Sequence, residues 1–256
     1  MHAPAATAII EPALLLLAYR SGIFPMADSR EDSEIFWVEP RRRAVLPLDG
    51  FHCSHSLAKL LRQGRFEVTC NAAFGEVLRA CAGPRRDGAE TWISARIEAS
   101  YRALHAEGQA HSIECWQGGV LVGGLYGVGF DRVFCGESMF SRATGASKVA
   151  LAWLVAALRR GGAELLDCQF MTPHLASLGA IEIGQQDYLE WLRAAQVPIV
   201  GVGSGAALGA GDGEGEGEAA GLALPEGFAA LLAEAVAAGS SSSPGNFIAQ
   251  SFTQTS

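Results

Sequence analysis

Three consecutive strand patterns lie between Ser112 and Phe140, in the stretch SIECWQGGVLVGGLYGVGFDRVFCGESMF. Two glycine-bearing turns, Gln117–Gly119 and Gly129–Asp131, separate them. Short turns of this kind join neighbouring antiparallel strands. The stretch therefore predicts a three-stranded antiparallel meander, with strands at Ile113–Trp116, Val120–Val128 and Arg132–Phe140.

The residues that follow the meander predict a helix and a return to the same sheet. The apolar run from Ser147 to Arg160 is long enough for a helix, and Gly161-Gly162 is a strong C-terminal stop signal. A buried strand is expected next, then a short helix and a last strand, at Glu164–Phe170, Pro173–Leu178 and Ala180–Ile183. A helix between two strands of one sheet makes a crossover, so we expect a mixed sheet between about residues 110 and 195.

The first 109 residues have a more helical pattern than the meander. Periodicity predicts one strand at Phe66–Thr69 and helices at Ala13–Ser21, Ser54–Arg62, Ala73–Ala82 and Ser94–Glu107. We therefore predict the α+β class, with a small N-terminal helical and mixed domain over residues 1–109 and a mixed-sheet domain over residues 110–199.

The last part of the chain, residues 200–256, has the composition of a flexible tail rich in Gly, Ala and Ser. Nine glycines lie between Gly201 and Gly221, interleaved with Ala and Glu. Only Pro225–Gly239 has the pattern of a short helix. Because the tail offers little apolar surface for burial, we expect truncation after about Val200 to leave the activity and the melting temperature nearly unchanged.

The composition of the 256 residues, 49% hydrophobic and 18% charged, is that of a folded protein. No apolar run predicts a membrane span, and the N-terminus lacks the basic region of a signal peptide. Six cysteines with no C-x-x-C pair suit free thiols in a reducing cytoplasm, so we expect a cytoplasmic protein without a membrane partner. The net charge of −8 does not exclude a polyanionic partner, because a local basic patch decides such binding.

An acid stands inside the otherwise apolar strand Leu165–Phe170. Asp167 and Gln169 are two residues apart there, so we expect both side chains on one sheet face, with Leu166 and Cys168 on the other. A carboxylate in so apolar a strand is costly unless it is paired or functional. Asp167 either caps the next turn, or accepts a proton or anchors an ammonium, with Gln169 orienting the same group.

Glu137 is a second acid between apolar neighbours, in the strand pattern that ends at Phe140. Strand periodicity places it on one face with Cys135 and Met139. Glu137 either points into a partly enclosed site or is a solvated carboxylate at a sheet edge, and periodicity alone leaves both interpretations open.

Basic residues gather in three places: Arg41–Arg43, Lys59 with Arg62 and Arg65, and Arg85-Arg86. Lys59 and Arg62 are three residues apart, so they share one helix face. Such clusters are either solvated surface or contacts to nucleic acid, and charge alone does not separate the two.

The segment Arg142–Ser147 leads directly into the predicted helix that ends at Arg160. Backbone N–H groups at a helix start, helped by Gly145, form an anion site. The alternative is an ordinary N-cap supplied by Thr144 or Ser147.

A set of motifs runs along about residues 13–195: Gly22-Ile-Phe-Pro25, Phe36-Trp37 with Glu39-Pro40, Thr91-Trp-Ile93, His111-Ser112 with Glu114, Gly123-Gly-Leu-Tyr-Gly127, Phe134-Cys-Gly-Glu-Ser-Met-Phe-Ser141, Ala146-Ser-Lys148, Leu166-Asp-Cys-Gln169, and His174 with Ser177-Leu-Gly-Ala180. In this order the motifs resemble the leucyl/phenylalanyl-tRNA-protein transferases, bacterial enzymes of the N-end rule pathway. Several of the motifs are long, so chance agreement is improbable.

The resemblance implies a GNAT-like C-terminal domain and the transfer of Leu or Phe from aminoacyl-tRNA to proteins with an N-terminal Arg or Lys, which marks them for degradation. It assigns Asp167 and Gln169 as the reaction-centre pair, and Glu137 as a residue that helps hold the reactive or acceptor amine. We expect neither a cofactor nor a metal, and the basic cluster of Lys59, Arg62 and Arg65 is the candidate tRNA-binding site. The substrate-binding residues that it implies are Leu125, Phe134, Leu151, Leu158, Trp37 and Trp92. Ordinary core packing is the alternative for the four apolar residues Leu125, Phe134, Leu151 and Leu158.

Two other functions fit parts of the sequence. GNAT proteins often carry a pyrophosphate loop of the form R/Q-x-x-G-x-G/A, and Arg142–Ser147 departs from it by having Ser147 in the final place. An acetyl-CoA-dependent N-acetyltransferase of the GNAT type is therefore the alternative enzyme, and a tRNA-binding module without catalysis is the non-enzymatic alternative. Incubation with Phe-tRNA or acetyl-CoA and an Arg-initiated peptide separates the three.

Overall fold

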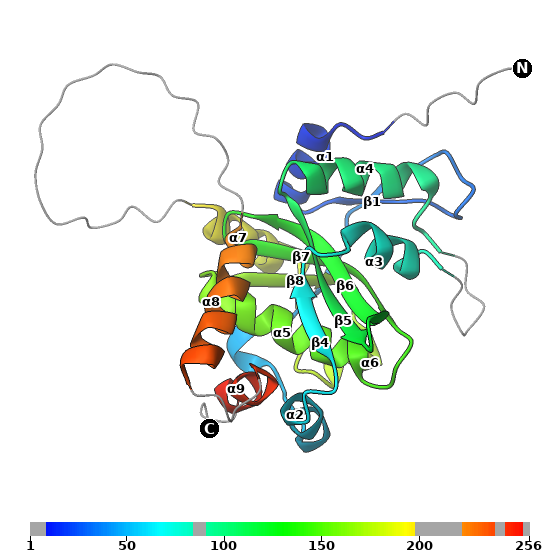
Figure 1. Cartoon of the computed structure of the whole chain (residues 1–256). Coiled ribbons are helices and arrows are strands. Elements are labelled where there is room, and N and C mark those ends of the chain that lie inside the picture. The colour runs from blue at the N-terminus through cyan, green and yellow to red at the C-terminus, as the bar shows by residue number, and fades with distance from the viewer. Residues whose placement is uncertain (1–8, 84–90, 198–221, 239–243, 253–256) are drawn as a thin grey trace, which may run out of the picture.

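The computed structural model describes residues 9–83, 91–197, 222–238 and 244–252. A seven-stranded mixed sheet forms the centre, and helices cover both of its faces (Figure 1). In spatial order the strands are β4 (Glu67–Cys70), β5 (Ala110–Gln117), β6 (Val120–Phe130), β7 (Val133–Ser141), β8 (Leu165–Gln169), β3 (Arg42–Val45) and β9 (Ile181–Gly184).

The predicted meander forms the middle of this sheet. β5, β6 and β7 are antiparallel neighbours, with Ile113 opposite Leu125 and Leu125 opposite Met139. β8 pairs with β7 in parallel, and Asp167 lies opposite Cys135. A parallel neighbour needs a crossover connection, which helix α5 (Ala146–Arg160) supplies. The α+β class and the mixed sheet are therefore confirmed.

A helix and a two-stranded sheet form the small N-terminal domain. Helix α1 (Pro12–Arg20) is followed by β1 (Phe24–Met26), which pairs antiparallel with β2 (Phe36–Val38). Helices α3 (Phe74–Cys81) and α4 (Ala95–Ala106) contact each other, and α4 also contacts α1 (Figure 1). These helices lie together over one face of the main sheet.

Two strands from the first 109 residues belong to the main sheet. β3 lies between β8 and β9, and β4 lies at the edge beside β5. The sequence pattern predicted a strand at β4 but none at β3, because Arg42-Arg43 open that short segment with charges. The domain division at residue 109 stays a prediction, since the sheet takes strands from both sides of it.

Serine side chains mark the starts of two predicted helices. The Oγ atom of Ser54 accepts a hydrogen bond at the start of α2 (His55–Arg62), and Ser94 does the same for α4. Helix α6 (Pro173–Ala176) follows the cap Thr172. Helix α7 (Gln185–Gln196) was not predicted, because its start has no side-chain cap and its buried stripe is only Tyr188, Leu192 and Ala195.

Two hydrophobic clusters lie on opposite faces of the sheet. One includes α5 and α2 together with Leu125, and the other includes α1, α3 and α4 together with Tyr126. The neighbouring residues Leu125 and Tyr126 fall in different clusters, as alternation along a strand requires. Helix α5 is apolar all round and has eleven of its fifteen residues buried, so it is an interior helix.

The short helix predicted at Pro225–Gly239 is present, but the C-terminal helices are packed on the body and do not form the flexible tail that the sequence predicted. Helix α8 (Leu224–Ala237) packs along α5, and α9 (Pro244–Ser251) packs on α2 (Figure 1). The ring centroids of Phe228 and Trp153 are 5.3 Å apart, and those of Phe252 and Phe51 are 4.8 Å apart. Gly227 permits the close approach of α8 to α5, because a Cβ atom there would clash with the backbone.

The expectation for the tail is therefore wrong for residues 222–238 and 244–252. Averaging the composition over the whole tail hid a group of apolar side chains beyond Gly221. These buried side chains are Leu222, Leu224, Phe228, Leu231, Ile248 and Phe252. The glycine-rich run itself falls within residues 198–221, which lie outside the described residues.

Two observations bear on the surroundings of the protein. No helix in the described part of the chain has the length and apolar character needed to cross a bilayer. The six cysteines all fall within the described ranges, and they form no disulfide.

Candidate active site

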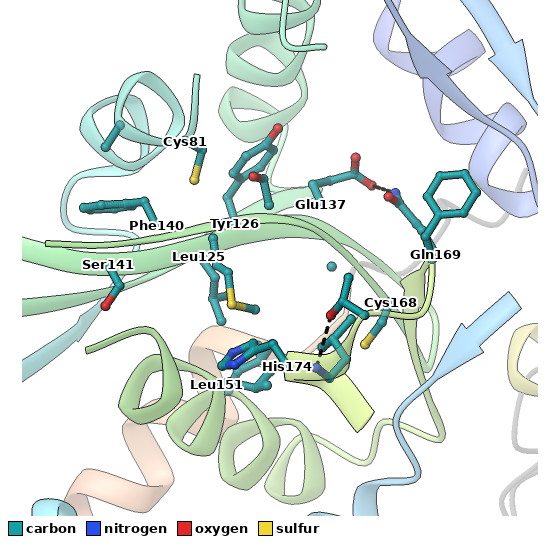
Figure 2. Close-up of a pocket in the computed structure, with 18 of the residues that line it drawn as sticks. Cys81, Leu125, Tyr126, Glu137, Phe140, Ser141, Leu151, Cys168, Gln169 and His174 are labelled. Atoms are coloured by element: carbon teal, nitrogen blue, oxygen red, sulfur yellow. Dashed lines mark hydrogen bonds between the residues drawn. The ribbon is translucent and has the colours of Figure 1, made fainter. Parts of the chain in front are cut away.

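A cavity of about 970 Å³ lies where β6, β7 and β8 meet α3, α5 and α6 (Figure 2). The pairing of β7 with β8 ends at Cys135 and Asp167, although β7 continues to Ser141. The part of β7 beyond this point is therefore free on that side, and Gly136 to Ser141 line the cavity. Its apolar wall consists of Leu125, Met139, Leu151, Leu154, Leu166 and Leu175.

Glu137 lies at a polar end of the cavity. Its Oε2 atom accepts a hydrogen bond of 2.9 Å from the Tyr101 hydroxyl. Its Oε1 atom accepts one of 2.7 Å from Gln169 Nε2 (Figure 2). The Tyr101 hydroxyl is also hydrogen-bonded to that of Tyr19. Glu137 is only 8% exposed, so it is not a solvated carboxylate at a sheet edge.

Burial raises the pKa of Glu137 to about 7, because the charged carboxylate is poorly solvated in this position. Hydrogen bonds from Tyr19, Tyr101 and Gln169 act in the opposite direction, and the negative charge of Asp167 adds to the rise. Burial, followed by the charge of Glu137, also raises the pKa values of Tyr19 and Tyr101. The carboxyl group therefore titrates near neutral pH, while both tyrosines keep their protons.

Gln169 and Asp167 do not share a face, contrary to the strand pattern. Gln169 is the last residue of β8 and has a φ of 62°, in the left-handed region. It lines the cavity together with Leu166 and Cys168, whereas Asp167 is outside the lining and fully buried. The Gln169 N–H donates to Asp167 Oδ1 at 2.8 Å. The prediction failed because strand alternation ends where φ becomes positive.

Asp167 forms a buried ion pair with Arg43 of β3. Arg43 Nη2 donates to Asp167 Oδ2 at 2.6 Å, and the two side chains are 1% and 0% exposed. The Tyr188 hydroxyl donates to the same oxygen at 2.9 Å. The guanidinium carbon also lies 4.9 Å and 4.4 Å from the ring centroids of Phe24 and Tyr188. Burial disfavours the charge of Arg43, but the attraction of Asp167 outweighs it and raises the pKa of Arg43.

His174 supplies a polar atom beside the apolar wall, close to Leu151 (Figure 2). Its Nε2 atom is buried and has no hydrogen-bond partner among the described residues. Burial lowers the pKa of His174, and the charge of Lys148 lowers it further. The imidazole is therefore neutral near pH 7 and can bind a polar group of a ligand.

The structure separates the six residues predicted to bind substrate. Leu125, Leu151 and Trp92 line the cavity. Phe134 and Leu158 lie outside the lining and are fully buried in the core. Trp37, the sixth, is 39% exposed on β2 and is also outside the lining.

The predicted tRNA-binding residues lie on the surface outside the cavity. Lys59 and Arg62 are exposed on α2, and Arg65 is exposed just beyond it. The Arg65 guanidinium carbon is 5.6 Å from the centroid of the Phe66 ring. Of the other basic clusters, Arg43 is used in the ion pair with Asp167, and Arg85 and Arg86 lie outside the described residues.

The start of α5 differs from both interpretations of its sequence. Gly145, with a φ of 85°, is the N-cap, and no side chain caps the helix. The Ser147 N–H donates to Ser141 Oγ, and the Ala146 N–H donates to the carbonyl oxygen of Ala143. Because these two donors are already bonded, the helix start is a poor site for a pyrophosphate group.

Several residues of the site were missed by sequence reasoning. Tyr101 and Tyr188 come from helices α4 and α7, and no local pattern connects either residue to an acid in a distant strand. Arg43 carried a usable signal, because it precedes Ala44-Val45-Leu46 and is thus a base at the edge of an apolar run. Matching this base with the acid Asp167 would have suggested their pairing.

Metal ligands are not grouped in the part of the chain that the structure describes. No set of three or more His, Cys, Asp or Glu side chains there is placed to hold a metal ion. His52 and His55 are both exposed near the start of α2.

An apolar wall that leads to a buried, hydrogen-bonded carboxyl group defines a cavity for a ligand with an apolar arm and a polar reactive end. Sequence comparison identifies the family. The model of the family described as "Leucyl/phenylalanyl-tRNA protein transferase" matches residues 45–193, and the model of the same family's N-terminal domain matches residues 9–41. The chain therefore belongs to the leucyl/phenylalanyl-tRNA protein transferase family, as its motifs indicated.

Two relatives show the extent of the similarity. The leucyl/phenylalanyl-tRNA–protein transferase of Novosphingobium aromaticivorans is 64% identical over 261 residues, which cover 96% of this chain and 97% of the relative. That of Rhizorhabdus wittichii is 58% identical over 194 residues, which cover 76% of this chain and 78% of the relative. Among solved structures, L-PGS from Bacillus licheniformis gives a TM-score of 0.35 at 13% identity, over 66% of this chain and 56% of that chain, and so low a similarity supports no conclusion.

Proposed function

We propose that this protein transfers Leu or Phe from aminoacyl-tRNA to the N-terminal Arg or Lys of acceptor proteins, which marks them for degradation. Membership of the family and the names of the two relatives support the aminoacyl transfer. The observation that carries the proposal is the cavity in which an apolar wall leads to Glu137 and Gln169. The cytoplasm is the proposed location, since it keeps six thiols reduced.

The reaction places modest demands on the protein. An aminoacyl ester is already activated, so its carbonyl carbon reacts with a neutral amine without a further reagent. A peptide bond forms, the ester C–O bond breaks, and the ribose oxygen leaves with a proton that the amine has lost. The protein must therefore hold the amine against the carbonyl carbon, receive or relay the proton, and stabilise the charge on the carbonyl oxygen.

Glu137 and Gln169 have the chemistry for the amine side of this reaction. With a pKa of about 7, Glu137 is ionised in part near neutral pH, so it attracts the acceptor's positive charge and also accepts a proton. Gln169 Nε2 is held on Glu137, which fixes the amide at the cavity wall. We assign Glu137 to holding the acceptor amine and Gln169 to orienting it.

Asp167 acts on the reaction through Gln169. It is fully buried and bonded to Arg43, Tyr188 and the Gln169 N–H, so it does not contact a ligand in the cavity. Its charge also adds to the raised pKa of Glu137. We therefore assign Asp167 as a positioning residue, and not as the group that accepts a proton, which was one of several roles that its sequence position left open.

The apolar wall suits the side chain of the transferred residue. Leu125 and Leu151 form part of this wall, and Phe134 and Leu158 support it from the core. A volume of about 970 Å³ exceeds what one Leu or Phe side chain needs, so the cavity also has room for the terminal nucleoside. Trp92 lines the cavity and offers an aromatic face to a base. No role is assigned to Trp37 inside the cavity.

Transfer from labelled Phe-tRNA to an Arg-initiated peptide tests the proposal, with acetyl-CoA as the second donor. We expect a labelled N-terminal Phe and no acetylation, with little transfer by the Gln169→Ala variant. Acetylation without aminoacyl transfer would establish the alternative N-acetyltransferase. Binding of tRNA without either reaction would leave only a tRNA-binding module.

A further inference from the structure

Two arginines lie at the end of the cavity away from Glu137. Arg79 comes from α3, and Arg142 follows β7 directly. Both line the main cavity, and both line a smaller adjoining cavity of about 230 Å³. Figure 2 shows Phe140 and Ser141, the residues before Arg142, on the side of the cavity opposite Glu137. Arg142 follows Glu137 by five positions, and the chain between them is extended, so their Cα atoms are roughly 16 Å apart.

Both guanidinium groups have donors to spare. Arg79 Nε donates to the carbonyl oxygen of Gly75 at 3.1 Å, and Arg142 Nη1 donates to that of Leu121 at 3.4 Å. Among the described residues, neither arginine is in an ion pair. A guanidinium has five N–H donors, so most remain available to a ligand.

The local charge at this end of the cavity is positive. Glu76 also lines the smaller cavity, so the two arginines and this carboxylate leave one net positive charge there. Arg142 is held over the ring of Phe140, with its guanidinium carbon 5.3 Å from the ring centroid. This contact gives the Arg142 side chain a fixed direction. The local positive charge contrasts with the net charge of −8 for the whole chain.

The segment after Arg142 contacts α2, the helix that carries Lys59 and Arg62. The loop after Arg142 reaches Gly145, and a Cβ atom at Gly145 would lie 2.5 Å from Leu60 Cδ2 on α2. Lys59 and Arg62, on the same helix as Leu60, are exposed. Arg142 is therefore three residues from a contact with the helix that carries Lys59 and Arg62.

We propose that Arg79 and Arg142 bind the phosphate that links the last two nucleotides of the aminoacyl-tRNA. The proposal rests on the proposed function and adds a direction to it. The polyanionic donor enters from the arginine end, and the cationic acceptor enters from the Glu137 end. Guanidinium groups suit this task because they bind phosphate oxygens in pairs of parallel hydrogen bonds. The same positive charges repel an acceptor with N-terminal Arg or Lys from the wrong end of the cavity.

The test compares two donors that differ in the phosphate. One is Phe-tRNA, and the other is phenylalanyl-adenosine, which has the same ester but no phosphate. For Arg79→Gln combined with Arg142→Gln, we expect the KM for Phe-tRNA to rise about 10- to 100-fold and the KM for phenylalanyl-adenosine to stay unchanged. The matched control is Arg193→Gln, which removes an exposed arginine of α7 outside both cavities.

Two further measurements keep the outcomes distinct. The single variant Arg79→Gln removes only a bond to its own helix, so its KM ratio remains informative if the double variant is unstable. Binding of an uncharged RNA minihelix that ends in CCA, followed by fluorescence anisotropy, tests the phosphate contact without turnover.

Four results would overturn the assignment or separate it from the proposed function. Equal KM increases for both donors would mean that the arginines only shape the cavity. No increase for either donor would remove them from the binding site. Equal minihelix binding by the double variant and the wild type would mean that the arginines bind no phosphate of the RNA. Failure of the wild type to transfer Phe would refute the proposed function, while weaker minihelix binding by the variants would still support the phosphate site.

Discussion

Asp167→Asn removes one charge from the buried pair with Arg43 and nearly preserves the side-chain shape. Because the two side chains are 1% and 0% exposed, water cannot replace the lost partner of Arg43. Removing one member of a buried ion pair costs about 3–5 kcal/mol. At roughly 2–4 °C per kcal/mol for a chain of this size, we expect the melting temperature to fall by roughly 6–20 °C.

Urea unfolding followed by tryptophan fluorescence measures this loss by linear extrapolation. Glu182→Gln is the matched control, because Glu182 pairs with Arg42, the neighbour of Arg43, in a pair that is 63% and 39% exposed. Such a surface pair contributes about 0–1 kcal/mol. The double variant Arg43→Met with Asp167→Asn leaves no unpaired charge, so it should be more stable than Asp167→Asn alone.

The same variant separates positioning from proton transfer. If Asp167 were itself the base, transfer by the folded variant would fall about 10²- to 10⁴-fold. In that case Glu137 would not set the pH midpoint of the remaining activity. As a positioning residue, Asp167 adds to the raised pKa of Glu137, so its neutralisation should lower that midpoint. The reasoning is refuted if Asp167→Asn is no less stable than Glu182→Gln, or if the double variant is as unstable as Asp167→Asn.

Three further predictions follow from the packing, the titration and the surface charge. Phe228→Ala removes the contact with Trp153 and should lower the free energy of unfolding in urea by about 3–5 kcal/mol. Val236→Ala, on the exposed side of α8, should lower it by less than about 0.5 kcal/mol. Equal losses would show that α8 is not docked. The pKa of Glu137 is raised from 4.5 to about 7 in the folded state, so between these pH values unfolding releases its proton. The free energy of unfolding of the wild type should therefore fall as the pH rises from 4.5 to 7. The Glu137→Gln variant lacks this titrating group and should lack its contribution to the fall. Indistinguishable pH–stability curves would refute the shift. Replacing Lys59, Arg62 and Arg65 with Gln should flatten the salt dependence of tRNA binding by about one unit of slope per lost contact, and an unchanged slope would remove them from the interface.

The regular elements could be predicted because their signals are local. Ser54 and Ser94 stand at the starts of α2 and α4, and alternating apolar residues with glycine turns mark β5, β6 and β7. A helix followed by a strand indicated the crossover, and hence a mixed sheet, in which β8 proves to pair in parallel with β7. None of these inferences required knowledge of distant contacts.

The parts that escaped prediction depend on distant contacts or on one backbone angle. β3 is a strand because it pairs with β8 and β9, and its own residues Arg42 and Arg43 do not indicate one. The side chain of Gln169 reaches Glu137 because the φ of Gln169 is positive, whereas strand periodicity applies only to extended residues with negative φ. The helices beyond Gly221 pack on α5 and α2, whose surfaces are assembled only in the folded chain.

The two acids of the site differ in the partners that the fold gives them, and this difference divides their roles. Asp167 faces the guanidinium of Arg43, so its charge is balanced within the protein. Glu137 receives hydrogen bonds from the neutral donors Tyr101 and Gln169, and its pKa is raised to about 7 as a result of its burial. A cationic acceptor placed beside Glu137 supplies a positive charge, which the neutral donors Tyr101 and Gln169 do not. Under the proposed function, binding of the acceptor therefore favours the ionised carboxylate, and the carboxylate in turn favours the acceptor over a neutral competitor.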